Sequence, residues 1–315
     1  MSKRSFESIN YMLRPNKNVE RKLIASTLLR IQAEFSIRDY RYVGFGSMWF
    51  SDFILMHKIV GISDMVTIEG EISRSKRVEF NKPFGCINVK MGKAETVLGD
   101  VIDEKNSVVW LDYDGPLKSA LTGDLEIAIG AMSPGSIFLV SVNAMVDQLK
   151  GHIVDESPLS PAEYLAEICD SDSMLSQASR LTRNDFPSLV AEILHDRVKA
   201  TILSLKPGCE YQPIWTFSYA DEAQMLTIGG MIVDKSSAER LARTNVFDLP
   251  YASRDAIFEV SIPVLTEKEK RALDRHLPSE NKILAKNLDF ELKQKEIDAY
   301  QAFYLEYPVF NELVA

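Results

Sequence analysis

Five short apolar segments recur between residues 40 and 142, separated by segments that favour helix. The apolar segments cover residues 40–43, 65–68, 87–91, 108–111 and 136–142. The helix-favouring segments cover residues 51–59, 73–80, 94–98 and 117–131. Strands that alternate with helices predict a parallel sheet with helices on both faces, because right-handed crossovers leave few other arrangements.

The alternation ends after residue 142. Residues 145–205 are mostly polar with helical spacing, which predicts a helical insertion. Two more strands, at 213–219 and 225–233, lie too close in sequence for a parallel crossover and predict an antiparallel hairpin. We therefore expect an N-terminal helical extension (1–39), an α/β domain (40–235) and a C-terminal helical extension (236–315).

The composition predicts a globular protein of the cytoplasm. Hydrophobic residues make up 46% of the 315 residues and charged residues 26%, which are ordinary globular values. No apolar run approaches the roughly 20 residues of a membrane helix, and the first residues lack the apolar core of a signal peptide. Three cysteines at unrelated spacings favour a reducing compartment and give no metal-ligand pattern.

The net charge of −9 is unevenly distributed. Residues 1–93 contain 16 Lys and Arg against 9 Asp and Glu, a balance of +7, whereas the remainder carries −16. A basic first third in an acidic chain is typical of a local anion-binding surface, although solvated helix faces produce the same pattern. The −16 remainder argues against a broad, nonspecific nucleic-acid surface.

Small and acidic residues follow four of the predicted parallel strands. These residues are Gly44 and Gly46 after the first strand, Glu69 after the second, Gly92 after the third, and Asp112 and Asp114 after the fourth. In an open parallel sheet, ligands bind beyond the carboxyl ends of the strands. Glycines let the backbone approach a ligand closely, and a carboxylate after the second strand can accept both hydroxyls of a ribose. The pattern therefore predicts a nucleoside-containing cofactor.

Two classes of enzyme fit this pattern: NAD-dependent oxidoreductases and methyltransferases that use S-adenosyl-L-methionine. The third glycine of the dinucleotide fingerprint is absent, because Trp49 stands in its place. A bulky side chain there obstructs the approach of a pyrophosphate. S-adenosyl-L-methionine has no pyrophosphate, so the sequence favours the methyltransferase.

Residues 40–235 resemble the class I S-adenosylmethionine-dependent methyltransferases. The segment Val43-Gly44-Phe45-Gly46-Ser47 is similar to their first motif, Thr67-Ile68-Glu69 to the acidic ribose motif, and Trp110 to Gly115 to the fourth motif. The resemblance implies a Rossmann-like sheet of seven strands. The chain also resembles a bacterial group of O-methyltransferases, through Arg14-Pro15-x-Lys17, Glu20-Arg21-Lys22, Phe80-Asn81-Lys82-Pro83-Phe84 and Leu111 to Gly115.

The resemblance also implies a role for each matching residue. Gly44, Phe45, Gly46 and Ser47 would hold the methionine end of the cofactor and Glu69 its ribose, with Glu71 as the competing acid. Asp112 would line the methyl group and Asp114 would act as a base. Gly92 and Lys93 stand where the adenine is bound, but Lys93 replaces the usual acid and leaves Glu95 as a substitute.

The acceptor side is less constrained by the sequence. Arg14, Lys17 and Arg21, with Tyr113, are predicted to bind the acceptor. Together with Lys22 and the basic residues at 74–82, they would form a groove for a phosphate-bearing acceptor, either a nucleotide or a nucleic acid strand. No metal is expected, because the two aspartates lack an evident third ligand. The alternative from another class is a binding or regulatory protein on a degenerate methyltransferase fold.

Overall fold

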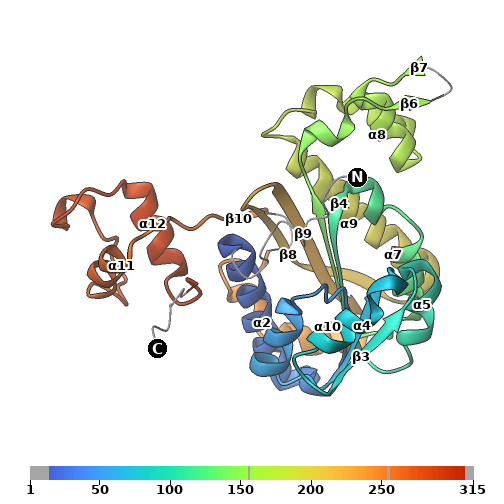
Figure 1. Cartoon of the computed structure of the whole chain (residues 1–315), viewed down its shortest axis with the longest axis horizontal. Helices are drawn as coiled ribbons and strands as arrows, with labels where there is room; N and C mark the ends of the chain where they lie inside the picture. Colours follow the sequence, from blue (N-terminus) through green and yellow to red (C-terminus); the bar gives the residue numbers. More distant parts are fainter. Residues whose placement is uncertain (1–13, 155–156, 254–255, 309–315) are drawn as a thin grey trace.

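A mixed β-sheet runs through the centre of the molecule (Figure 1). The structure is a computed structural model that describes residues 14–154, 157–253 and 256–308. Within these ranges the sheet has eight strands in the order β10-β8-β9-β5-β4-β1-β2-β3. Their bounds are β1 (Arg41–Gly44), β2 (Asp64–Glu69), β3 (Ile87–Met91), β4 (Ser107–Pro116), β5 (Ile137–Asn143), β8 (Glu210–Ala220), β9 (Gln224–Val233) and β10 (Phe258–Val260).

The prediction of five parallel strands is confirmed. Strand β1 lies between β2 and β4, so that Gly44 pairs with Thr67 on one side and Trp110 on the other. Strand β3 extends the sheet beyond β2, and β5 extends it beyond β4. The carboxyl ends of β1, β2 and β4 therefore meet at the same edge of the sheet.

The predicted antiparallel hairpin is also confirmed, but the expected number of seven strands is wrong. Strand β9 pairs antiparallel with both β5 and β8. The eighth strand, β10, pairs parallel with β8 and places Phe258 opposite Phe217. Three residues give too little periodicity to distinguish a strand from the charged, helix-favouring sequence around it. Aromatic packing of Phe258 on the core holds β10 at the edge.

Each face of the sheet is covered by its own hydrophobic core, because successive side chains of a strand point to opposite faces. Tyr42 and Trp110 pack into one core, whereas Val43 and Leu111 pack into the other. The first core is covered by α2 (Pro15–Phe35), α3 (Ser51–Leu55), the π-helical turn η3 (Met56–Val60), α4 (Ser75–Asn81) and α10 (Lys235–Arg243). The second is covered by α5 (Ala94–Val101), α6 (Leu117–Ala120), α7 (Asp124–Ala131) and α9 (Phe186–Leu205).

Helix α2 is fixed to the sheet at its first turn. Pro15 occupies the first turn, where its missing N–H costs nothing. The carboxylate of Asp221, from the β8–β9 turn, accepts hydrogen bonds from the backbone N–H groups of Asn16 (3.0 Å) and Lys17 (3.1 Å). This long-range cap places the buried face of α2 over the carboxyl ends of the central strands.

The helix predicted over residues 117–131 is divided in two. Helix α6 ends near Leu121, and α7 begins after Gly123. The Thr122 hydroxyl donates to the carbonyl of Ser119, and a short polar side chain that bonds locally in this way competes with helical hydrogen bonding.

The segment after β5 extends beyond the carboxyl end of the sheet (Figure 1). It contains the short hairpin β6 (Ile153–Val154) and β7 (Ser157–Pro158), helix α8 (Pro161–Cys169) and the 3-10 segments η5 (Val146–Leu149) and η6 (Asp172–Arg180). Its last helix, α9, returns to pack against β8 and β9. Helix α9 is therefore part of the layer that covers the sheet.

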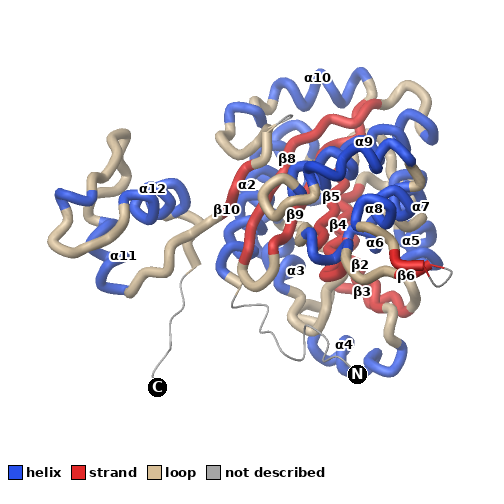
Figure 2. The backbone as a smooth tube through the Cα atoms, turned by 90° about the horizontal axis from the view of Figure 1, so that it is seen from above, coloured by secondary structure: helices blue, strands red, loops and turns tan. Residues whose placement is uncertain are grey.

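The C-terminal helices α11 (Glu267–Asp274) and α12 (Gln294–Phe303) lie to one side of the sheet (Figures 1 and 2). They share a small core around Leu273, Ile297 and Tyr300. The remaining 3-10 turns are η2 (Ile37–Asp39), η4 (Ile72–Arg74), η7 (Val246–Asp248) and η8 (Ala285–Asn287). Within the described ranges, every helix is too short or too polar to cross a bilayer.

Candidate active site

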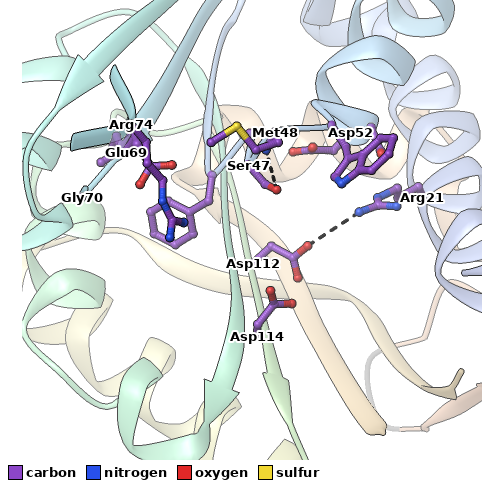
Figure 3. Close-up of a pocket in the computed structure, with 14 residues that line it drawn as sticks. Arg21, Ser47, Met48, Asp52, Glu69, Gly70, Arg74, Asp112 and Asp114 are labelled. Carbon is purple, nitrogen blue, oxygen red and sulfur yellow. Dashed lines mark hydrogen bonds and ion pairs between the residues drawn. The ribbon is translucent and has the colours of Figure 1, made fainter. Parts of the chain in front are cut away.

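A cavity of about 280 Å³ opens at the carboxyl ends of β1, β2 and β4. Its walls come from the loop after β1, the end of β2, the end of β4 and the inner face of α2 (Figure 3). Glu69 and Arg74 lie on one side of the cavity, and Arg21 and Asp52 lie on the other. The sheet therefore brings together residues that are up to 93 positions apart in the sequence.

The loop after β1 lies close to the sheet because glycine occupies position 46. A Cβ atom on Gly46 would lie 2.7 Å from the Phe50 ring and 2.8 Å from the Thr67 hydroxyl. The backbone N–H of Gly46 donates to that hydroxyl at 2.8 Å. Ser47 and Phe50 adopt positive φ angles of 52° and 49°, which turns the chain sharply into α3. Phe45, Gly46 and Ser47 line the cavity, whereas Gly44 lies beneath them in β1.

Glu69 ends β2 and reaches the cavity. One of its carboxylate oxygens accepts the backbone N–H of Glu71 at 3.0 Å, which fixes its orientation. Glu71 forms an ion pair with Arg74 at 3.4 Å and does not line the cavity. Of the two acids considered from the sequence, Glu69 is therefore the one that faces a bound ligand.

Asp112 and Asp114 project from β4 into the cavity (Figure 3). They differ in environment: the Asp112 side chain is 18% exposed and that of Asp114 is 42% exposed. Asp112 accepts a hydrogen bond from Lys17 Nζ at 2.9 Å and lies 4.0 Å from Arg21. Asp114 pairs with Arg14 at 3.5 Å.

Five charged side chains, four of them buried and Asp112 half-buried, form a cluster at the cavity: Lys17, Glu20, Arg21, Asp52 and Asp112. Lys17 Nζ lies 3.0 Å from Glu20, donates to the Tyr219 hydroxyl at 2.8 Å and lies over the Trp110 ring. Glu20 and Arg21 each lie one helical turn after Lys17, and all three are on the buried side of α2.

The cluster fixes the charge states around the cavity. Burial opposes ionisation of Asp112, but the charges of Lys17 and Arg21 outweigh it and lower the pKa of that carboxyl. Burial raises the pKa of Asp52 against the attraction of Arg21, and Tyr42 donates its hydroxyl proton to that carboxylate in a short hydrogen bond. Asp112 is therefore a fixed negative charge and a poor base.

The expected open basic groove is not formed by α2. Lys17 and Arg21 are 1% and 4% exposed, and three carboxylates balance their charges. Lys22 donates to the backbone carbonyl of Glu306. The sequence could not show this burial, because a run of basic residues on a helix does not reveal which residues face the sheet.

Besides Gly44, Arg14 and Lys17, three more of the expected site residues do not line the cavity: Gly92, Lys93 and Tyr113. Gly92, with a φ of 147°, donates its N–H to the carbonyl of Glu69 at 2.9 Å and so remains beside the end of β2. Lys93 is exposed and pairs with Glu95 at 3.4 Å. Tyr113 packs edge-on against Phe45 and donates to Asp124.

The sequence interpretation missed Ser51, Asp52 and Glu20. Asp52 is a single acid in an otherwise apolar helix start, and Glu20 lies one turn from Lys17. Either pattern could have signalled a buried charge. Among the described residues, no group of three or more His, Cys, Asp or Glu side chains is arranged to hold a metal ion.

Several solved structures are similar to this chain. One is an O-methyltransferase from Bacillus cereus in complex with S-adenosylhomocysteine, with 14% identity, a TM-score of 0.34, and coverage of 69% of this chain and 90% of the other. Another is an O-methyltransferase of tomaymycin synthesis from Streptomyces achromogenes in complex with S-adenosylmethionine, with 13% identity, a TM-score of 0.37, and coverage of 72% and 91%. At this level of similarity, neither says anything about the substrate of this chain. No curated protein sequence is similar to it.

A protein-family model described as "Putative O-methyltransferase" matches residues 9–315. The match includes α2, the whole sheet, the segment after β5 and the C-terminal helices. The strand order with an antiparallel β9 agrees with the sheet that the resemblance to class I enzymes implies. The family match confirms the prediction of an O-methyltransferase family. The chain belongs to this family of O-methyltransferases.

Proposed function

We propose that this protein transfers a methyl group from S-adenosyl-L-methionine to an oxygen or nitrogen acceptor at the carboxyl ends of β1, β2 and β4. The observation that carries this proposal is the single cavity that joins Glu69 to Asp112 and Asp114 past the Gly46–Ser47 loop. The family description favours oxygen as the acceptor atom.

Each part of the cavity has a role in this proposal. Glu69 accepts the ribose hydroxyls, and Gly92 beside it marks the adenine side together with Lys93. The loop from Gly44 to Ser47 supports the methionine portion. The cofactor supplies an electrophilic methyl group on a sulfonium. The protein aligns the acceptor with that methyl group and excludes water, which are its main contributions to a displacement reaction.

A hydroxyl or amine acceptor must lose a proton, and in this proposal Asp114 takes it. Its carboxylate lies at the cavity and is more exposed than that of Asp112. Asp112 is held ionised by Lys17 and Arg21, so its role is a fixed negative charge beside the cationic methyl donor.

Calorimetric titration with S-adenosylhomocysteine tests the cofactor site. Glu69→Gln removes the charged acceptor and should weaken binding by about 1.5–3 kcal/mol, the range for a hydrogen bond to a charged group. Glu79→Gln is the matched control, because Glu79 is exposed on α4 and pairs with Lys82. Equal affinities of both variants would move the ribose contact to Glu71, and no binding by the wild type would refute the proposal.

Turnover separates an enzyme from a degenerate binding protein. We expect labelled methyl groups to pass from S-adenosyl-L-methionine into an extract component, with a large loss in Asp114→Asn. Transfer that is unchanged in Asp114→Asn would remove the residue from the role of base. Binding of the cofactor without any transfer would favour a binding or regulatory function.

A phosphate-bearing acceptor is a second candidate, favoured by the basic residues of α4. Arg74 lines the cavity, and Lys76 and Arg77 are exposed on the helix that follows it. Filter binding of single-stranded RNA and duplex DNA at two salt concentrations tests this candidate, because phosphate contacts give a steep salt dependence. Binding should fall in the Lys76→Glu, Arg77→Glu double variant. No binding at low salt would exclude a nucleic acid acceptor.

A further inference from the structure

Three hydrogen-bond donors line the cavity, and one of them, Arg21, lies across it from Glu69 (Figure 3). Arg21 is 4% exposed and lines the cavity, and its Nε has no hydrogen-bond partner among the described residues. Trp49 Nε1 and Ser51 Oγ are also buried without a hydrogen-bond partner among the described residues, and both residues line the cavity. A buried donor without an acceptor costs about 1–3 kcal/mol, so three that line one cavity indicate a site for an acceptor group of a ligand.

Two carboxylates lie beside these donors. Asp52 is 6% exposed and lies across the cavity from Glu69, near Arg21 (Figure 3). Asp112 lies 4.0 Å from the Arg21 guanidinium. This end of the cavity therefore presents donors for a negative group and acceptors for a positive group. That combination complements the zwitterion of an α-amino acid.

We propose that this wall recognises the amino-acid end of the methyl donor, with Arg21, Trp49 and Ser51 on its carboxylate and Asp52 and Asp112 facing its ammonium. The inference rests on the proposed function, because it needs the ribose on Glu69. The ribose and the amino acid are opposite ends of the donor, so a ribose at Glu69 places the amino acid at α2. Arg21 is then a cofactor ligand instead of an acceptor ligand.

A phosphate is a weaker fit to the same wall. A phosphate carries no ammonium to face Asp52 and Asp112, so these carboxylates would repel its negative charge. The amino-acid zwitterion satisfies both signs. The N-terminal helix α2 thereby completes the cofactor site from outside the predicted α/β domain.

Three adenosine thioethers of graded length separate the contributions of the carboxylate and the ammonium to binding. S-adenosylhomocysteine has both the ammonium and the carboxylate, 5′-(3-aminopropyl)thioadenosine lacks only the carboxylate, and 5′-methylthioadenosine lacks both. In calorimetric titrations the wild type should prefer S-adenosylhomocysteine over the aminopropyl compound by about 10- to 100-fold, the range for hydrogen bonds to a charged group. Arg21→Gln should lose this preference and keep its affinity for methylthioadenosine.

Methylthioadenosine binding also reports whether each variant is folded. Ser51→Ala, a milder change, should reduce the preference several-fold, and Arg21→Lys should retain part of it. Lys22→Gln is the control, because Lys22 is on α2 but outside the cavity. If Arg21→Gln does not fold, Ser51→Ala and Arg21→Lys decide the question.

A preference for the carboxylate that survives in all three variants would overturn the inference and leave the cofactor site intact. A wild type that binds all three compounds equally would do the same. A wild type that binds none of them would refute the proposed function itself, and the inference with it.

Discussion

Replacing Lys17 by methionine should destabilise the protein far more than the same replacement of a surface lysine. Lys17 Nζ lies 3.0 Å from Glu20 and 2.9 Å from Asp112, and Glu20 is fully buried. At an effective dielectric constant of about 20, each pair contributes about 5 kcal/mol of attraction before desolvation is subtracted. Removing one partner of a buried pair costs about 3–5 kcal/mol, because the other charge remains buried.

The loss should depend on pH with a defined sign. Burial already raises the pKa of Glu20 against the attraction of Lys17, and removing Lys17 raises it further. A carboxyl whose pKa is higher in the folded state stabilises that state at low pH, and the contribution disappears as pH rises through the folded-state value. The variant should therefore be least stable relative to wild type above neutral pH and recover toward pH 4–5.

Urea unfolding at pH 7.5 and pH 5 measures both effects. Lys22→Met is the control, since Lys22 makes one hydrogen bond to a backbone carbonyl and should cost about 0.5–1.5 kcal/mol. Adding Glu20→Gln to Lys17→Met should restore part of the loss, because it removes the uncompensated charge. A loss below about 1 kcal/mol, as for an exposed pair, or a loss that grows at low pH, would refute the buried-cluster interpretation.

Three further predictions concern the loop after β1, a half-buried histidine and the cofactor class. Gly46→Ala should destabilise the folded protein by about 1–3 kcal/mol and weaken S-adenosylhomocysteine binding, because the added Cβ would lie 2.7 Å from the Phe50 ring. Gly85→Ala is the control, because there is open space around Gly85. It should change neither the urea unfolding curve nor the affinity measured by calorimetry. Burial lowers the pKa of His195 to about 4, so wild type should lose stability as pH falls from 6.5 to 4, by up to about 1.4 kcal/mol per pH unit. His195→Gln should lose less stability over this range, and His276→Gln, at an exposed position, should follow wild type. Parallel curves of stability against pH for all three proteins would contradict the assignment. Thermal-shift assays should show stabilisation by S-adenosylhomocysteine and none by NAD or NADP, since Trp49 lines the cavity where a pyrophosphate would approach; stabilisation by NAD would revive the oxidoreductase alternative.

Local sequence patterns determined the central sheet. The β-prone runs and their helical spacers specified β1 to β5, because apolar periodicity reflects burial on a sheet or a helix face. The five residues between the predicted strands 213–219 and 225–233 specified the β8–β9 hairpin, because they are too few for a parallel crossover. Strand β10 has only three residues, and its place depends on aromatic contacts with Phe217 from a distant strand. No local pattern records such a contact.

The residues of the candidate site also fall into those that local sequence predicted and those that only the tertiary structure revealed. Gly46, Glu69, Asp112 and Asp114 follow predicted strands, so parallel topology alone brought them to one edge. The face that α2 buries was decided by its docking, through the long-range cap on Asp221.

The sequence showed only that Glu20 and Arg21 are charged residues one helical turn after Lys17. Tertiary packing turned them into a buried cluster with Asp52 and Asp112, where low polarity makes each missing partner costly. Sequence by itself thus determined the class of sheet and the edge where we propose that the cofactor binds. Only the tertiary structure decided which charges line that edge, because burial and pairing depend on residues that are far apart in the chain.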